Sequence, residues 1–207
     1  MKNSTNAGGI ELILWDFDGV LMDSNAIREH GFRKVLASFP KKHVDNLLDF
    51  HRKNGGLSRY VKFRYFIEEC LKDTASDDDI KMYADSFSVI MQDLLVDKKL
   101  LITETINYVK ENYLKLPMHI VSGSDQTELR SLCEQLDISK YFMSISGSPI
   151  TKSILVTNVL NNCQIERDQV VLIGDSINDY DAAKANGIKF SAYNNKSLEQ
   201  FSDLKII

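Results

Sequence analysis

The stretch Leu-Ile-Leu-Trp-Asp-Phe-Asp-Gly-Val-Leu-Met-Asp-Ser (Leu12–Ser24) sets both the fold and the chemistry of the chain. Its first four residues are apolar and predict a buried strand. The strand leads directly into two carboxylates, Asp16 and Asp18, and a carboxylate is costly to bury without a partner. Because ligands bind at the carboxyl ends of strands in open α/β sheets, we interpret this pair as part of a functional site.

The order of the predicted elements indicates an α/β fold with one all-helical insertion. Apolar residues at helical spacing predict helices over residues 26–39 and 44–51, from Ser58 onward, and over 80–96, with no strand pattern between about residue 20 and residue 99. Strands are predicted over residues 10–17, 117–122, 141–146, 169–174 and 188–193. The helices that alternate with the later strands cover residues 103–115, 125–136, 151–162 and 178–186.

This alternation predicts a Rossmann-like parallel sheet with right-handed crossovers. We expect residues 1–21 and 100–207 to form this α/β core. We expect residues 22–99 to form a helical cap domain, inserted after the first strand.

Composition is that of an ordinary soluble globular protein. The chain has 207 residues, of which 43% are hydrophobic and 26% charged, and its net charge is −4. This mild acidity gives no general attraction to nucleic acid or to an anionic membrane surface. The three cysteines (Cys70, Cys133 and Cys163) are scattered, so reduced thiols are expected rather than disulfides or a zinc site.

The remaining features of the sequence also favour a cytoplasmic protein. Residues 1–9 are polar and form a short tail without the apolar segment of a signal peptide. No apolar run approaches the roughly 18 residues of a membrane span. We therefore expect a cytoplasmic location, with no membrane and no nucleic-acid partner.

Three predicted strands end in polar residues of a similar kind. The first ends at Asp16 and Asp18, the strand over 117–122 at Ser122-Gly123-Ser124, and the strand over 169–174 at Gly174-Asp175-Ser176, with Asp179 four residues later. In a parallel sheet these ends meet at one edge. A cluster of carboxylates without nearby His or Cys favours a hard cation with oxygen ligands, which predicts Mg²⁺.

These residue types suit phosphoryl transfer. One carboxylate can act as a nucleophile and form an aspartyl-phosphate, while a second exchanges a proton with the leaving oxygen and with water. A lysine is then required to balance the charge of the nucleophile and of the transferring group. Lys152 fits this role at the start of a predicted helix.

Four segments, taken in order, resemble the motifs of the haloacid dehalogenase superfamily. They are Asp16-Phe17-Asp18-Gly19-Val20-Leu21, then Ser122, then Lys152, then Gly174-Asp175-Ser176-Ile177-Asn178-Asp179. The resemblance covers nearly the whole chain, including the cap. It looks like the subfamily that contains phosphoglycolate phosphatase and β-phosphoglucomutase. The third motif departs slightly, because Ser153 follows Lys152 where family members often have proline.

The resemblance assigns a role to each of these residues. Asp16 is implied as the nucleophile and Asp18 as the general acid and base. Mg²⁺ is implied to bind Asp16, the backbone carbonyl of Asp18 and Asp175, with support from Asp179. The implied holders of the phosphoryl oxygens are Ser122, Gly123 and Lys152.

Two residues discriminate between activities within the superfamily. The dehalogenases resemble this pattern without a carboxylate at the position of Asp18, so this residue favours phosphoryl transfer. The mutase carries a histidine where this chain has Arg28, with His30 two places away, which favours a phosphatase over a phosphomutase. A non-catalytic binding module with the same fold is a third hypothesis, and the complete set of motif residues argues against it.

The cap loop Gly55-Gly56-Leu57-Ser58-Arg59 resembles the substrate-specificity loop of the mutase subfamily. Arg59 is expected to bind an anionic or hydroxyl-rich part of the substrate, and Lys62 lies one turn further along the same helix face. The expected substrate is a small phosphorylated metabolite: a sugar phosphate, a phosphoglycolate-like compound or an intermediate of surface-polysaccharide assembly. A monomer would suffice, because the cap already covers the site. A dimer is the alternative oligomeric state.

Each of these residues also has a purely structural interpretation. Asp16, Asp18 and Ser122 could cap turns or helices, and Asp175 and Asp179 could stabilise a helix start. The ordered set of motifs favours the functional interpretation over these. By contrast, the histidines at positions 43, 51 and 119 lack the spacing of metal ligands and are expected to be structural.

Overall fold

The structure is a computed structural model of the chain, and it describes residues 9–207. The predicted polar tail therefore lies outside the described residues, except for Gly9. The helices are α1 (Asn25–Val35), α2 (Lys41–Lys53), α3 (Arg59–Tyr65), α4 (Asp77–Leu94), α5 (Thr103–Asn112), α6 (Gln126–Gln135), α7 (Lys152–Asn161) and α8 (Ile177–Asn186). The strands are β1 (Leu12–Trp15), β2 (Met118–Asp125), β3 (Ser144–Ser148), β4 (Val170–Gly174) and β5 (Lys189–Ala192).

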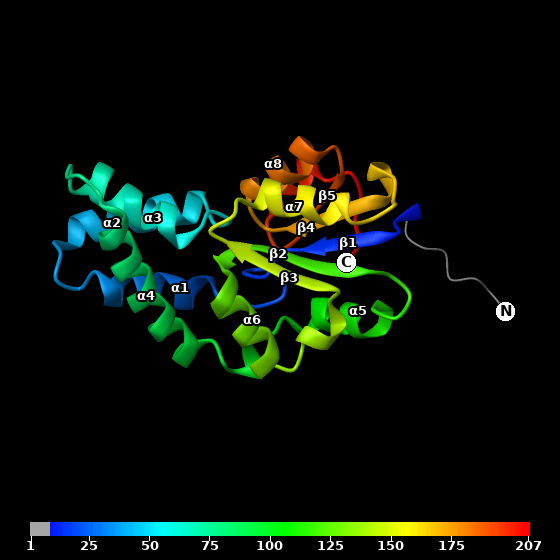
Figure 1. The fold of residues 1–207 in the computed structure, drawn as a ribbon, viewed down its shortest axis with the longest axis horizontal. Coiled ribbons are helices and arrows are strands. Elements are labelled where there is room, and N and C mark those ends of the chain that lie inside the picture. Colours follow the sequence, from blue (N-terminus) through cyan, green and yellow to red (C-terminus); the bar gives the residue numbers. More distant parts are fainter. Residues whose placement is uncertain (1–8) are drawn as a thin grey trace.

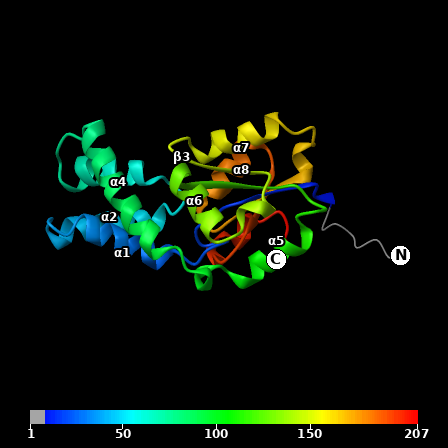
Figure 2. The same ribbon diagram turned by 60° about the horizontal axis from the view of Figure 1, so that its bottom comes forward.

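The five strands form one parallel sheet in the order β3-β2-β1-β4-β5. Strand β1 lies in the centre, where Trp15 pairs with Ile120 of β2 and with Ile173 of β4. Helices α7 and α8 cover one face of the sheet, and α5 and α6 cover the other (Figures 1 and 2). The predicted Rossmann-like parallel sheet is therefore confirmed.

Strand β1 is fully buried because both of its faces are covered. Leu12 and Leu14 join the apolar cluster beneath α7 and α8, whereas Ile13 and Trp15 join the larger cluster on the opposite face. This two-sided burial explains why the strand has no polar position before Asp16.

Helices α1–α4 form a separate group beside the carboxyl end of the sheet, towards which the strand arrows point (Figure 1). Their core is aromatic: the Phe32 ring lies 5.3 Å from that of Phe63 and 4.5 Å from that of Phe87. The all-helical cap predicted after the first strand is present. Its exact limits, residues 22–99, stay our proposal. Among residues 9–207, no helix is long and apolar enough to cross a membrane.

Several element boundaries differ from the prediction. Helix α4 begins at Asp77 rather than at residue 80, because the Ser76 side chain accepts a hydrogen bond from the Asp79 backbone N–H and caps the helix. Strand β2 extends to Asp125, which then caps α6 by accepting from the N–H groups of Thr127 and Glu128. Strand β3 begins three residues later than predicted, because Ser139–Tyr141 form a helical turn.

Candidate active site

The turn after β1 brings the first two aspartates to the edge of the sheet. The Phe17 carbonyl accepts hydrogen bonds from the N–H groups of Leu21 and Met22, which closes the turn tightly. Gly19 within it has φ of +76°, and a Cβ at this position would overlap the Asp175 carboxylate. Glycine is therefore required for the turn to pack against the end of β4.

Three carboxylates meet at this edge. Asp16, Asp175 and Asp179 each offer an oxygen, and these oxygens all lie within 4.8 Å of one another. Burial and the Asp179 charge raise the pKa of Asp16 well above its ordinary value, and they raise the pKa of Asp175 to about 7. A divalent cation among these oxygens would favour the ionised forms, so the donor set fits Mg²⁺.

Lys152 connects two of these carboxylates. It is the first residue of α7, and its Nζ lies 2.8 Å from Asp16 Oδ1 and also contacts Asp179. Burial alone would lower the pKa of this ammonium, but the two carboxylates outweigh burial and raise it above the ordinary value. Lys152 is therefore a permanent positive charge beside the predicted nucleophile.

Asp18 lies outside this carboxylate group in different surroundings. Its side chain accepts hydrogen bonds from Arg28 Nε (2.9 Å), from Ser124 Oγ (2.5 Å) and from the Ser24 hydroxyl. Burial acts to raise the pKa of Asp18, but the Arg28 charge and these hydrogen bonds lower it to about 2. Asp18 is thus an ionised carboxylate, and these neighbours make it a weaker base than an ordinary aspartate.

Ser122 and Gly123 lie in the second half of β2, which continues past the predicted end at Ser122 to Asp125. Ser122 is buried, and its Oγ accepts a hydrogen bond from the Ser124 backbone N–H (3.1 Å), so its own proton is free to be donated. Gly123 packs against the backbone of Gly56 in the cap loop. This contact places the cap loop directly over the predicted phosphate-binding segment.

A cavity lies between the sheet edge and the cap. Asp16, Asp18, Ser122 and Asp175 line its core side, and Arg28, Arg59 and Lys62 line its cap side. His51 also lines it; burial, followed by the Lys62 charge, lowers the pKa of this histidine to about 3. His51 thus occupies the cavity as a neutral ring, which the structural interpretation from the sequence did not anticipate.

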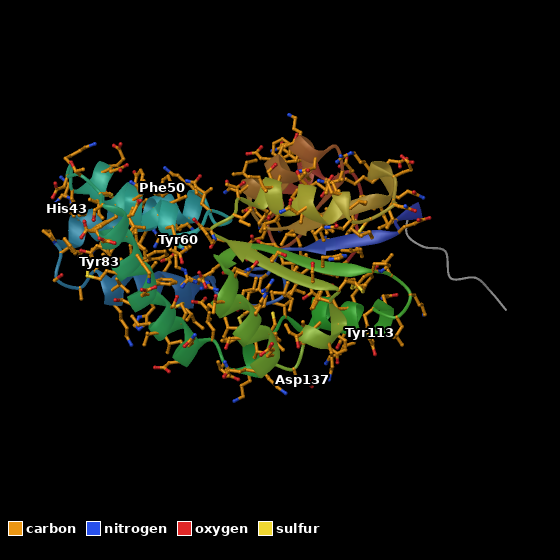
Figure 3. The ribbon with its side chains drawn as sticks, in the orientation of Figure 1. His43, Phe50, Tyr60, Tyr83, Tyr113 and Asp137 are labelled. Atoms are coloured by element: carbon orange, nitrogen blue, oxygen red, sulfur yellow. The ribbon has the colours of Figure 1, made fainter. Side chains whose placement is uncertain are left out.

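Arg59 reaches the cavity, and its charge is already paired. Its Nη1 lies 2.6 Å from Glu128 Oε2 and 2.6 Å from Ser88 Oγ, and its guanidinium stands 4.8 Å from the centre of the Phe87 ring. Arg28 contacts the same carboxylate, with Nη1 2.8 Å from Glu128 Oε1. The cap and the core are also joined by Tyr60, labelled in Figure 3, whose hydroxyl donates to Asp125 Oδ2 (2.8 Å).

Sequence reasoning named Ser124 only as part of a polar strand end, and it missed Glu128. In the structure Ser124 Oγ accepts from Arg28 Nη2 (2.8 Å), and Glu128 accepts from both Arg28 and Arg59. Glu128 is the third residue of α6, where a glutamate is an ordinary helix-start residue. Arg28 lies 100 positions before it, so no local pattern connects the two. Helical spacing does not connect Ser124 with Glu128 either, because Ser124 lies in β2 and only Glu128 lies in α6.

Comparisons with known proteins identify the family and the fold of this chain. The profile of the haloacid dehalogenase-like hydrolases matches residues 13–193. A curated phosphorylated carbohydrates phosphatase from Thermotoga maritima is 25% identical over 188 residues, covering 87% of this chain and 83% of the relative. The similarity to this curated phosphatase supports the prediction that the chain is a phosphatase.

Two solved structures show the same fold at low sequence identity. CbbY from Rhodobacter sphaeroides, in complex with xylulose-(1,5)bisphosphate, is 13% identical with a TM-score of 0.76, covering 95% of this chain and 93% of that one. β-Phosphoglucomutase from Clostridium difficile is 17% identical with a TM-score of 0.71, covering 96% and 91%. With the family profile covering most of its length, the chain belongs to the haloacid dehalogenase-like hydrolases, the superfamily that its motifs predicted.

Proposed function

We propose that this hydrolase is a Mg²⁺-dependent phosphatase that cleaves small phosphomonoesters through an aspartyl-phosphate on Asp16. The observation that carries the proposal is the convergence of Asp16 with Lys152 and two further carboxylates, beneath a cap that covers the site. Asp16, Asp175, Asp179 and the Asp18 backbone carbonyl would hold Mg²⁺. When bound, the ion would neutralise charge on the carboxylates and on the phosphoryl oxygens.

In the first step, an Asp16 carboxylate oxygen attacks phosphorus, and the bond from phosphorus to the ester oxygen breaks. The departing oxygen takes a proton from Asp18, so the negative charge of the bound phosphate must first raise the pKa of this carboxyl from about 2 for Asp18 to hold that proton. In the second step, Asp18 takes a proton from water as the water oxygen attacks the aspartyl-phosphate, releasing inorganic phosphate and restoring Asp16. Lys152 and the Ser122 hydroxyl stabilise the phosphoryl oxygens in both steps.

The test is release of phosphate from p-nitrophenyl phosphate with and without Mg²⁺. We expect Asp16→Asn to lower kcat by at least about 1,000-fold, because no other group replaces the nucleophile. Asp23→Asn is the matched control, since Asp23 is an exposed carboxylate of the same turn. Mass spectrometry of acid-quenched wild-type enzyme should detect a phosphoryl adduct on the peptide that contains Asp16. Equal activity of Asp16→Asn and wild type would refute the proposal.

A phosphomutase would use the same first step, so product analysis is needed to separate the two activities. Arg28 occupies the position at which the mutase has a histidine, and here its guanidinium is held by Asp18 and Glu128. We therefore expect free phosphate to form faster than an isomerised sugar phosphate. The opposite ratio would identify a mutase.

We further infer that the enzyme works in the cytoplasm as a monomer on a small phosphorylated metabolite, without nucleic-acid or membrane partners. The three free cysteines, the mild negative charge and the cap supplied by the same chain support this view. Size-exclusion chromatography with light scattering would test the monomer.

A further inference from the structure

At the cap end of the cavity, the arginine side chains are held by a carboxylate that does not itself line the cavity. Glu128, in the first turn of α6, is only 1% exposed. Its two oxygens are divided between two cap residues: Oε1 accepts from Arg28 Nη1 (2.8 Å) and Oε2 from Arg59 Nη1 (2.6 Å). A buried carboxylate bound on both oxygens by charged donors is held firmly in place.

The arginines, in contrast, do face the cavity. Arg28 and Arg59 line it together with the aromatic faces of Phe32 and Phe87. Arg59 Nη2 and His51 Nδ1 are buried and have no hydrogen-bond partner among residues 9–207. Arg59 Nη2 is a donor, whereas a nitrogen of the neutral His51 ring donates or accepts according to its tautomer. A buried donor without a partner is costly, so a group that accepts a hydrogen bond from Arg59 at this end of the cavity would be stabilised.

The charges of the two arginines at this end are balanced. The third cation on the cap side, Lys62, donates to the Gly55 carbonyl, and burial lowers its pKa to about 7, so this lysine is mostly neutral above that pH. The two guanidinium groups of Arg28 and Arg59 are matched by the carboxylates of Asp18 and Glu128, through ion pairs of 2.6 to 2.9 Å. A leaving group with its own carboxylate or phosphate would therefore meet arginines whose charge is already neutralised, and it would lie near the Glu128 charge. A leaving group with uncharged hydroxyls meets no such penalty and can accept from Arg59 Nη2.

We propose that Glu128 is a positioning residue that determines specificity: by neutralising Arg28 and Arg59, it reserves the cavity for phosphomonoesters with uncharged, hydroxyl-bearing leaving groups and disfavours leaving groups with a second anion. This proposal rests on the phosphatase activity proposed above and names its substrate class. It differs from a purely structural role, in which Glu128 only attaches the cap to the core. If Glu128 had only a structural role, its replacement would lower kcat/KM for every substrate to a similar extent.

The first test uses the wild-type enzyme at pH 8 and two open-chain substrates of similar size. They are glucitol 6-phosphate, the uncharged sugar alcohol, and 6-phosphogluconate, in which a carboxylate replaces the terminal CH2OH group. We expect kcat/KM to be at least about tenfold higher for the uncharged sugar alcohol. Equal values, or a preference for the acid, would overturn the proposal whether or not any variant folds. Absence of turnover on p-nitrophenyl phosphate as well would instead refute the phosphatase activity itself.

The second test changes the charge and keeps the shape. Glu128→Gln should lower the ratio of sugar to acid by at least about tenfold, mainly through a lower KM for 6-phosphogluconate. Arg59→Gln removes the positive charge that pairs with Glu128, so it should raise the ratio of kcat/KM for the sugar to that for the acid. Glu134→Gln, at an exposed position of the same helix, should leave it unchanged. Parallel losses on both substrates in the Glu128 and Arg59 variants would show a structural role and overturn the assignment.

Discussion

At the residue scale, Asp16 and Asp18 stand two positions apart and differ in protonation behaviour. Asp16 lies among other carboxylates, so burial and the Asp179 charge raise its pKa despite Lys152. Asp18 faces Arg28, Ser124 and Ser24, and their combined effect exceeds that of burial and lowers its pKa to about 2. Neighbours contributed by distant segments thus give one short motif two chemically distinct carboxylates.

Arg28 is the residue that keeps Asp18 ionised, and its replacement should be visible in a pH profile. Arg28→Gln removes the positive charge while burial persists, so we expect the pKa of Asp18 to rise. With p-nitrophenyl phosphate, whose leaving group needs no proton, the acidic limb of log kcat against pH should move to higher pH. Arg33→Gln, at a more exposed position of α1, is the control and should leave the limb in place. An unchanged limb in the Arg28 variant would contradict the assignment of Asp18 as the base.

Gly19 gives a second prediction at this scale. Gly19→Ala combines a left-handed backbone, which costs about 1–2 kcal/mol for an L-residue, with overlap against the Asp175 carboxylate. We expect a loss of at least about 100-fold in kcat, since displacement of the Asp175 carboxylate, or of the turn that carries Asp18, disturbs the site. Gly9 has the same φ of +76°, and a Cβ added there would meet no atom within 4 Å, so Gly9→Ala isolates the backbone cost. Similar activity of the two variants would show that the overlap is relieved without moving the site.

At the scale of elements, prediction from sequence succeeded where the signal is local. Strand β1, the Ser58 cap of α3 and the end of α8 at Gly187 follow from apolar runs and capping residues, and the structure contains all three. Asp16, Asp175 and Lys152 meet because parallel strands align their carboxyl ends, which is a rule of topology. The interaction of Glu128 with Arg28 and Arg59 joins α6 to two cap helices, and it depends on how the cap packs, which no local pattern encodes.

Helix α3 carries a lysine whose burial should affect stability in a pH-dependent way. The ammonium of Lys62 donates to the Gly55 carbonyl (2.9 Å), and burial lowers its pKa from 10.5 to about 7. Between these pH values the unfolded chain holds a proton that the folded protein has released. The contribution of Lys62 to the free energy of unfolding therefore rises with pH across this window, and its penalty is greatest below pH 7.

Lys62→Met tests this sign. Methionine keeps an unbranched chain and carries no charge, so its Tm relative to wild type should be most favourable near pH 6 and should decline towards pH 10, as the wild-type penalty disappears. Thermal denaturation across this range is the measurement. Lys53→Met, at an exposed position just before the same cap loop, should differ from wild type by a constant amount. A constant difference for Lys62→Met as well would mean that its amine keeps its proton when buried.

At the scale of the whole molecule, the site joins segments from both ends of the chain, so a ligand there should stabilise the entire fold. Asp16 follows β1, whereas Asp175 and Asp179 follow β4, the neighbouring strand. Burial and the Asp179 charge raise the pKa of Asp175 from 3.8 to about 7 in the metal-free protein. Between these values the folded protein holds a proton that the unfolded chain lacks, so this contribution to stability falls as pH rises through the window.

Mg²⁺ should reverse this loss of stability at higher pH, because the ion takes the place of the proton on the ionised carboxylates and binds only to the folded protein. We expect the increase in Tm on adding Mg²⁺ to be clearly larger at pH 8 than at pH 5, where protons compete for the same oxygens. Asp175→Asn should abolish most of the increase at pH 8, whereas Asp168→Asn, at an exposed position just before β4, should retain it. An equal increase in Tm at both pH values, or an increase that persists in Asp175→Asn, would show that Mg²⁺ binds outside this group of carboxylates. The pH dependence thus connects the electrostatics of three aspartates to the stability of the whole chain.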